Sequence, residues 1–309
     1  MPSFAILFLL RIALGLAEAP SFPGAAQTVT RALPPQRRAA GFGVLFTGSS
    51  IGAAVSAVLA PTLAEWWGWR VALVGTAAVG LAWIPLWLLA TRAAATRAVL
   101  EPSGPAHGVP EVAWSSLIRL PAVWRAVAAV VAAAPVNGMI LQFGAKLLVT
   151  QHGLTQTDVR TYLWLPPLAF DTGAILFGVL ASAHARRHPG APARGLYVGA
   201  ALLLLGVGLL AVTETPWQTT LAAGLAMAGG GGAYAIATSD MLSRVPVSQV
   251  ASAGGLTAAA QSLALIVAFP LIGRVVQDTG SYHEVAVGLA LWTIPGAAFW
   301  LLVKPSPPA

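Results

Sequence analysis

Two ionisable side chains, Arg11 and Glu18, stand inside the first apolar stretch of the chain. A charged group at the centre of a membrane span costs roughly 2.5 to 3.5 kcal/mol, so such groups usually face a cavity or one another. Seven residues are close to two helical turns, so both side chains share a face and lie about 10 Å apart along the axis. The pattern suits proton binding by Glu18, with Arg11 attracting an anionic substrate or acting electrostatically on Glu18. Alternatively, the two residues have a purely structural role and form a charge network with a further helix.

Two prolines, Pro20 and Pro23, follow Glu18 directly. Each proline removes a backbone donor from the helix and thereby leaves carbonyl groups without partners near the acid. We therefore expect a bend or hinge beside Glu18.

Further polar residues interrupt later apolar stretches. Asp171 stands near the middle of one of them and is either a second proton-coupling group or an Asp that packs between helices. Asn137, Gln142 and Lys146 fall together in another; Gln142 and Lys146 share a helix face, and Lys146 is expected to reach the membrane surface. We take Gln142 as a candidate for substrate binding. Two more candidates are the only strongly polar residues in the body of their stretch, Gln261 and Ser262.

The elements that must position these residues are long apolar segments. Hydrophobic residues make up 57% of the 309-residue chain and charged residues only 9%, against about 25% in an ordinary soluble domain. A membrane helix needs roughly 20 apolar residues. Seven stretches of sufficient length contain no Asp, Glu, Lys or Arg: 39–64, 71–91, 126–145, 195–213, 215–239, 245–273 and 285–303. Two more, at about 3–30 and 160–183, are interrupted by Arg11, Glu18 and Asp171, which gives nine candidate spans.

The apolar runs are continuous and do not alternate with period two, so they predict helices and not barrel strands. The fold class is therefore all-α, a polytopic membrane protein. Because apolar spans continue to the end of the chain, no cleaved signal peptide is expected.

The basic residues are distributed unevenly between the two sides of this topology. Numbering the loops alternately places twelve on one side: Arg31, Arg37, Arg38, Arg92, Arg97, Arg119, Arg125, Arg186, Arg187, Arg194, Arg244 and Lys304. The other side receives Arg70, Arg160 and Arg274. This asymmetry predicts that the Arg-rich side is cytoplasmic, as in a multi-pass protein of the inner (cell) membrane with its C-terminus in the cytoplasm. The net charge of +7 then reflects topology, and we expect no nucleic-acid partner.

Nine spans with a cytoplasmic C-terminus place Met1 outside, so we expect helices to be missing from the front of the sequence or the start to be mis-assigned. A polar, Pro- and Gly-containing segment from Arg92 to about Pro121 is typical of a linker. The expected organisation is three helices in 1–92, a cytoplasmic linker in 93–120 and a six-helix bundle in 121–309.

Several kinds of chemistry are excluded or disfavoured. The chain has no cysteine, so disulfides, Cys-ligated metals and thiol nucleophiles are ruled out. His184 and His188 have helical metal-ligand spacing, but no carboxylate accompanies them, and we expect no metal or other cofactor. The run Gly229–Gly232 lacks the Lys and Ser or Thr of a phosphate loop and indicates a flexible or closely packed helix. No catalytic grouping suggests an enzyme.

The chain resembles the anion:cation symporter branch of the major facilitator superfamily, which includes hexuronate, galactonate and glucarate transporters. The residues that carry the resemblance are Arg11–Pro23 (RIALGLAEAPSFP), Leu33–Pro35 (LPP), Gly48–Gly52 (GSSIG) and Gly68–Arg70 (GWR). It is strong to about residue 92 and looser afterwards, with Lys146 and Asp171–Gly173 among the later landmarks.

The resemblance implies twelve helices in two bundles, of which nine are present, with the first three absent. It also implies alternating access around a central cavity. By the same resemblance, Glu18 matches the proton-coupling glutamate, Arg11 its companion arginine and Ser49 a position that faces the substrate. The sequence departs from the family pattern at three positions, with Ala32 in place of the usual Trp, Arg37 in place of an acidic residue and Leu263 in place of an Asn. These departures allow a substrate other than the sugar acids.

The function expected from these observations is proton-coupled import of a small organic anion, a sugar acid or related carboxylate. The expected partners are the anion, protons and the lipid bilayer, and the chain is expected to act as a monomer. Two alternatives stay open: a superfamily exporter or exchanger of other small molecules, and a truncated remnant or sensor that transports nothing.

Overall fold

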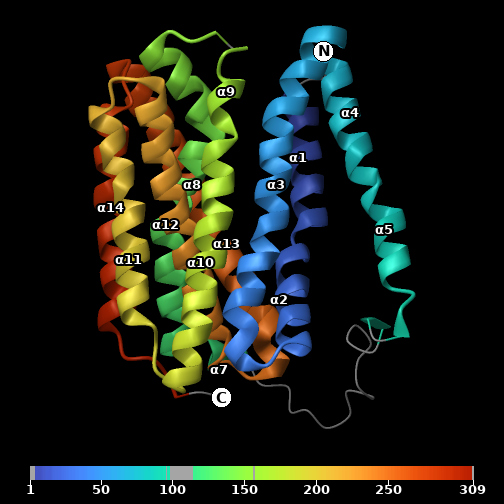
Figure 1. Cartoon of the computed structure of the whole chain (residues 1–309), viewed down its shortest axis with the longest axis vertical. Coiled ribbons are helices and arrows are strands. Elements are labelled where there is room, and N and C mark those ends of the chain that lie inside the picture. The colour runs from blue at the N-terminus through green and yellow to red at the C-terminus, as the bar shows by residue number, and fades with distance from the viewer. Residues whose placement is uncertain (1–3, 95, 98–113, 156, 308–309) are drawn as a thin grey trace.

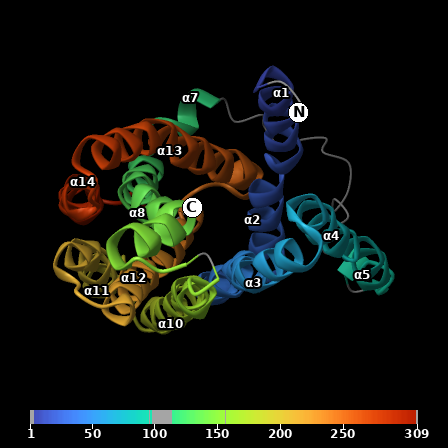
Figure 2. The same cartoon turned by 90° about the horizontal axis from the view of Figure 1, so that it is seen from above.

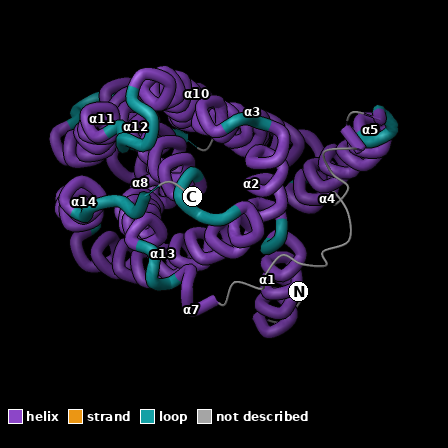
Figure 3. Tube along the Cα trace, turned by 90° about the horizontal axis from the view of Figure 1, so that it is seen from below, coloured by secondary structure: helices purple, strands orange, loops and turns teal. Residues whose placement is uncertain are grey.

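The computed structural model describes residues 4–94, 96–97, 114–155 and 157–307. All regular structure in these ranges is helical (Figure 3). The first group of helices is α1 (Phe4–Glu18), α2 (Ser21–Ala32), α3 (Pro35–Trp67), α4 (Trp69–Leu81) and α5 (Trp83–Ala90). The second group is α7 (Trp114–Leu117), α8 (Pro121–His152), α9 (Arg160–Leu163), α10 (Leu165–Arg187), α11 (Arg194–Leu205), α12 (Pro216–Leu242), α13 (Val250–Thr279) and α14 (His283–Leu302), with 3₁₀ turns η1 (Gly206–Val212) and η2 (Val247–Gln249). The all-α prediction is confirmed.

Eight helical segments among the described residues are long and apolar enough to cross a membrane, and Ile51–Trp67 of α3 adds a shorter apolar helix. Four of the eight combine consecutive elements: α1 with α2, α4 with α5, α9 with α10, and α11 with η1. These segments correspond to the nine stretches expected from the sequence. Lipid supplies no hydrogen-bond partner for the backbone, and a helix satisfies its own backbone groups internally.

Local sequence signals account for where the helices begin and end. Proline occupies the first turn of α8 and α12, where its missing N–H removes no helical bond. Thr215 and Gln218 form a reciprocal capping box at the start of α12. Gly153 and Gly280 end α8 and α13 in the left-handed region, at φ 65° and 67°, which glycine adopts without steric cost.

The predicted bend beside Glu18 is present as a break in the helix. Helix α1 ends at Glu18, and α2 begins at Ser21 after Ala19 and Pro20. Pro20 has no N–H to continue the hydrogen-bond pattern of α1. The break places Glu18 at the end of α1, three residues before α2 begins.

The six long helices that follow the predicted linker form one bundle (Figure 1). Seen from above, α2 lies beside α13 and α3 lies beside α10, whereas α1 and the α4–α5 pair project away from the bundle (Figure 2). Helix α1 contains no buried residue. Residues 98–113 of the predicted linker lie outside the described residues, and its end includes α7.

Helix α12 is the most buried of the candidate spans, and its glycine run explains how its neighbours come so close. A Cβ atom built on Gly229 would lie 2.2 Å from the backbone N of Leu204, and one on Gly231 would lie 2.2 Å from the carbonyl O of Phe170. Successive helical residues point about 100° apart. The glycine run therefore lets neighbouring helices approach α12 from several directions. Of the two interpretations of the run, a flexible helix or a closely packed one, the structure supports the closely packed helix.

The first prediction concerns this packing. The substitution Gly231→Ala should destabilise the protein by about 1–3 kcal/mol, because its methyl group meets rigid backbone of α10. Gly273→Ala in α13 is the matched control, since nothing lies within 4 Å of its Cβ position. Thermal unfolding of the purified variants measures both. Equal melting temperatures for the two variants would contradict the packing account.

Candidate functional site

A central cavity of about 640 Å³ lies between the bundle and the α2–α3 pair. Ligand pockets in proteins commonly have volumes of about 300–1,000 Å³ and mostly apolar walls with a few polar groups. The residues that line it are Ser21, Phe22, Ala25, Leu45, Val130, Ala134, Asn137, Gly138, Leu141, Gln142, Phe170, Met227, Tyr234, Thr238, Thr257, Ala258, Gln261, Ser262, Leu265 and Phe269. They come from α2 and α3 on one side and from α8, α10, α12 and α13 on the other.

The polar groups of this lining are neutral hydrogen-bonding groups. The Tyr234 hydroxyl of α12 donates to Gln261 Oε1 of α13 at 3.1 Å. Asn137 of α8 is buried, and its Oδ1 accepts no hydrogen bond from the described residues. No Asp, Glu, Lys, Arg or His occurs among the lining residues. The wall formed by these side chains therefore suits uncharged polar groups of a ligand.

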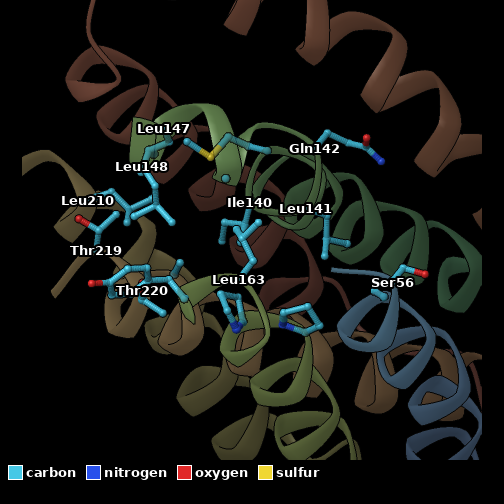
Figure 4. Close-up of a pocket in the computed structure, with 17 residues that line it drawn as sticks. Ser56, Ile140, Leu141, Gln142, Leu147, Leu148, Leu163, Leu210, Thr219 and Thr220 are labelled. Atoms are coloured by element: carbon cyan, nitrogen blue, oxygen red, sulfur yellow. The ribbon is translucent and has the colours of Figure 1, made fainter. Parts of the chain in front are cut away.

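A second cavity of about 400 Å³ continues from the first, since Leu141 and Gln142 line both. Figure 4 shows Ser56 of α3 on one side of it and Thr219 and Thr220 of α12 on the other. The remaining lining residues are chiefly aliphatic side chains of α8, α10 and α12 and Tyr162 and Leu163. Gln142 thus lies at the junction of a more polar and a more apolar compartment.

Beyond the central cavity, the α2–α3 pair closes onto the bundle at one end, here named the Arg-rich end because it holds Arg31, Arg187 and Arg244. The backbone N–H of Ala40 on α3 donates to the Ser182 hydroxyl of α10 at 3.1 Å. A Cβ on Gly43 would lie 2.7 Å from the carbonyl O of Ala174. These are direct contacts between the two groups of helices.

Three of the candidate residues from the sequence lie together in the central cavity: Gln142, Gln261 and Ser262. The Ser262 hydroxyl donates to the carbonyl O of Ala258, one turn earlier in α13. They come from α8 and α13, which are far apart in the sequence. Their role in substrate binding stays a prediction.

The structure does not bring the other candidates to this lining. Arg11 and Glu18 are exposed on α1, and Glu18 precedes the lining residue Ser21 by three positions. Asp171 is buried in α10 and is not a lining residue. The backbone of Ser49 lies in α3, and its side chain is outside the described residues.

Asn137 and Tyr234 line the cavity but were not among the sequence candidates. Asn137 is the only asparagine in the chain and stands in a charge-free stretch, so its type and position were the available signal. Tyr234 carries no comparable signal, because an aromatic residue in an apolar span is ordinary. Its role follows only from the hydrogen bond to Gln261 across two helices.

A buried charge cluster at the Arg-rich end was also not predicted from the sequence. Asp240 of α12 accepts hydrogen bonds from Arg125 Nη1 at 2.6 Å and from Arg244 Nη2 at 2.8 Å. Arg125 is fully buried over the ring of Trp300, and it donates to the Trp300 carbonyl at 3.0 Å. Arg244 also donates to the carbonyls of Gly190 and Ser306. The cluster around Asp240 therefore joins α8, α12, α14 and the C-terminal segment.

A model of the Major Facilitator Superfamily matches residues 1–269. The hexuronate transporter of Escherichia coli (strain K12) is 24% identical over 329 aligned residues, which cover 99% of this chain and 74% of that protein. A voltage-gated purine nucleotide uniporter of Homo sapiens is 27% identical over 130 residues, or 40% of this chain and 29% of that protein.

Among solved structures, a bacterial homologue of the human lysosomal transporter Spinster, inward-facing and unoccupied, aligns with a TM-score of 0.64. The alignment has 19% sequence identity and covers 98% of this chain and 78% of that chain. At this identity the likeness supports the fold alone.

The charge cluster generates the second prediction. Asp240→Asn should destabilise the protein by about 3–5 kcal/mol, because it leaves two buried guanidinium groups without their counter-charge. The control is Glu65→Gln, which removes the partner of Arg160 in an exposed pair at 3.9 Å and should cost at most about 1 kcal/mol. Melting temperatures of both variants measure the difference. A smaller loss for Asp240→Asn than for Glu65→Gln would contradict the assignment.

The third prediction tests whether the junction between the cavities holds water. Because the chain lacks cysteine, Gln142→Cys introduces a single thiol. In membranes open on both sides, a water-soluble maleimide should label it at least about tenfold faster than Leu263→Cys, since the reactive thiolate forms in water. Leu263 is 64% exposed on α13 but lines neither cavity, so it faces lipid. Equal labelling rates would show that Gln142 does not face an aqueous path.

Proposed function

The chain belongs to the major facilitator superfamily, and we propose that this membrane transporter imports a small organic anion of the hexuronate class together with protons. The observation that carries the proposal is the similarity to a hexuronate transporter along 99% of the chain. The central cavity supports it, because its volume and its hydrogen-bonding groups suit a six-carbon, hydroxyl-bearing molecule.

The proposed proton site is Glu18, at the break between α1 and α2. With Glu18 ionised, its negative charge disfavours a nearby anion, and protonation removes this repulsion. Arg11, on the same face of α1, attracts the substrate carboxylate. The lining residues Ser21 and Phe22 begin the helix that follows the break, so a change at Glu18 is transmitted to the cavity over a short distance.

Movement of the substrate then follows from alternate closure of the two ends of the cavity. The contacts of Ala40 with Ser182 and of Gly43 with Ala174 close the Arg-rich end in this structure. We assign this end to the cytoplasm from the asymmetry of basic residues. Proton and anion move inward together when these contacts separate and the opposite end closes. Asp171 is a second candidate for proton coupling, and Ser49 of α3 a second candidate for contact with the substrate.

A uniporter or exchanger is the second candidate function. The similarity to a voltage-gated purine nucleotide uniporter over 40% of the chain favours it, and so does the position of Glu18 away from the cavity lining. Transport by such a protein does not depend on a proton gradient. The same vesicle experiment separates the two functions.

The fourth prediction concerns Glu18. In proteoliposomes with a more acidic exterior, the unmodified chain should accumulate a radiolabelled hexuronate, and Glu18→Gln should abolish accumulation. The neutral amide mimics the protonated acid, so exchange of labelled for unlabelled hexuronate without a gradient should continue in this variant. Uptake with and without the gradient measures both processes.

Glu65→Gln is the matched control, because Glu65 is an exposed acid at the end of α3 outside both cavities. It should accumulate hexuronate as the unmodified chain does. Gradient-driven accumulation by Glu18→Gln would overturn the role of this residue. Uptake by the unmodified chain that does not respond to the gradient would favour the uniporter.

A further inference from the structure

Asn137 has an unusual environment within the bundle. Its side chain is 7% exposed, it lines the central cavity, and its Oδ1 accepts no hydrogen bond from the described residues. An unsatisfied buried polar group costs about 1–3 kcal/mol. Such groups are few in native proteins, and each calls for an explanation such as a functional role.

The opposite helix is shaped to accommodate this amide. A Cβ atom on Gly230 of α12 would lie 2.2 Å from Asn137 Oδ1 and 2.8 Å from Nδ2. A larger residue at position 230 would force the Asn137 amide to move. The glycine run therefore does more than bring helices together, because one of its members holds the Asn137 amide at the wall of the cavity.

Tyr234 follows Gly230 by one helical turn on α12, and its hydroxyl donates to Gln261 Oε1 of α13. Tyr234 and Gln261 also line the cavity. Three helices thus contribute a carboxamide, a phenol and a second carboxamide to the same cavity. Carboxamides offer both donors and acceptors, and a substrate hydroxyl needs both.

We propose that Asn137, Tyr234 and Gln261 form a neutral subsite for the hydroxyl-bearing part of the substrate, with Asn137 as the specificity-determining residue. The inference rests on the proposed function and names the part of the substrate that this wall recognises. A substrate hydroxyl donates to Asn137 Oδ1 once this oxygen, which now lies against Gly230 without accessible surface, turns toward the cavity. Among the described residues no charged side chain lines the cavity, so we assign the hydroxyl groups of the substrate to this wall and its carboxylate to other residues.

The test compares hexuronate with hexanoate, a six-carbon carboxylate that lacks hydroxyl groups. A site built to bind hydroxyl groups rejects an analogue without them, because its own polar groups stay unpaired. With the unmodified 309-residue chain in proteoliposomes, hexanoate should inhibit hexuronate uptake at least about a hundredfold more weakly than unlabelled hexuronate. This measurement requires no variant to fold.

The variant Asn137→Leu has a similar shape and no hydrogen-bonding group. It should raise the KM for hexuronate by about tenfold and leave inhibition by hexanoate unchanged, so that discrimination between the two ligands shrinks by about the same factor. Thr172→Val is the matched control, because its exposed hydroxyl bonds only the carbonyl of Leu168 in its own helix among the described residues. This control should keep the unmodified KM and discrimination.

The outcomes separate this inference from the proposed function. Hexuronate uptake with equal inhibition by hexanoate in the unmodified chain would overturn the subsite, and so would unchanged discrimination in folded Asn137→Leu. Absence of hexuronate uptake by the unmodified chain would overturn the proposed substrate and this inference with it.

Discussion

The close approach of α12 to its neighbours is the constraint on which the rest of the structure depends. The glycine run lets α12 lie against backbone of α10 and α11 and against the side chain of Asn137 on α8. In lipid, where the hydrophobic effect between helices is weak, such close packing is a principal source of association. The same helix carries Tyr234 at the cavity and Asp240 at the Arg-rich end. One helix thus contributes to the packing, the cavity wall and the charge cluster.

Two kinds of contact meet at the Arg-rich end: contacts within the bundle, and contacts between the bundle and the α2–α3 pair. Within the bundle, Asp240 between Arg125 and Arg244 ties α8, α12 and the C-terminal segment together through buried charged hydrogen bonds. Between the bundle and the α2–α3 pair, the contacts are one backbone-to-hydroxyl bond, close packing at Gly43 and an apolar cluster in which Ala26 and Phe42 pack against bundle residues such as Met241. Breaking the second set exposes apolar surface but no buried charge. This difference suits two bodies that move as rigid units.

The sequence predicts the helices well and the site in part. Charge-free stretches such as 126–145 predict the membrane spans, because lipid offers the backbone no hydrogen-bond partners and a helix satisfies its own. Pro20 predicts the break beside Glu18. Gln142 and Gln261 are found because a polar side chain in an apolar span is conspicuous. The hydrogen-bond partners of Asp240 and Tyr234 are not predicted from the sequence, because pairing between distant helices depends on packing angles that no local pattern encodes. Arg125 illustrates this point, since its position near a helix start resembles that of a loop arginine, although it is fully buried.

The proposed transport cycle requires the α2–α3 pair to separate from the bundle at the Arg-rich end. Cross-linking Ala40→Cys to Ser182→Cys with a short bifunctional thiol reagent joins the two bodies where they already touch, in a chain with no other cysteine. The measurement is hexuronate uptake by proteoliposomes before cross-linking, after cross-linking and after cleavage of the cross-link. We expect uptake to be lost on cross-linking and restored on cleavage, and each single-cysteine variant to be unaffected. Full uptake by the cross-linked protein would contradict the proposed cycle.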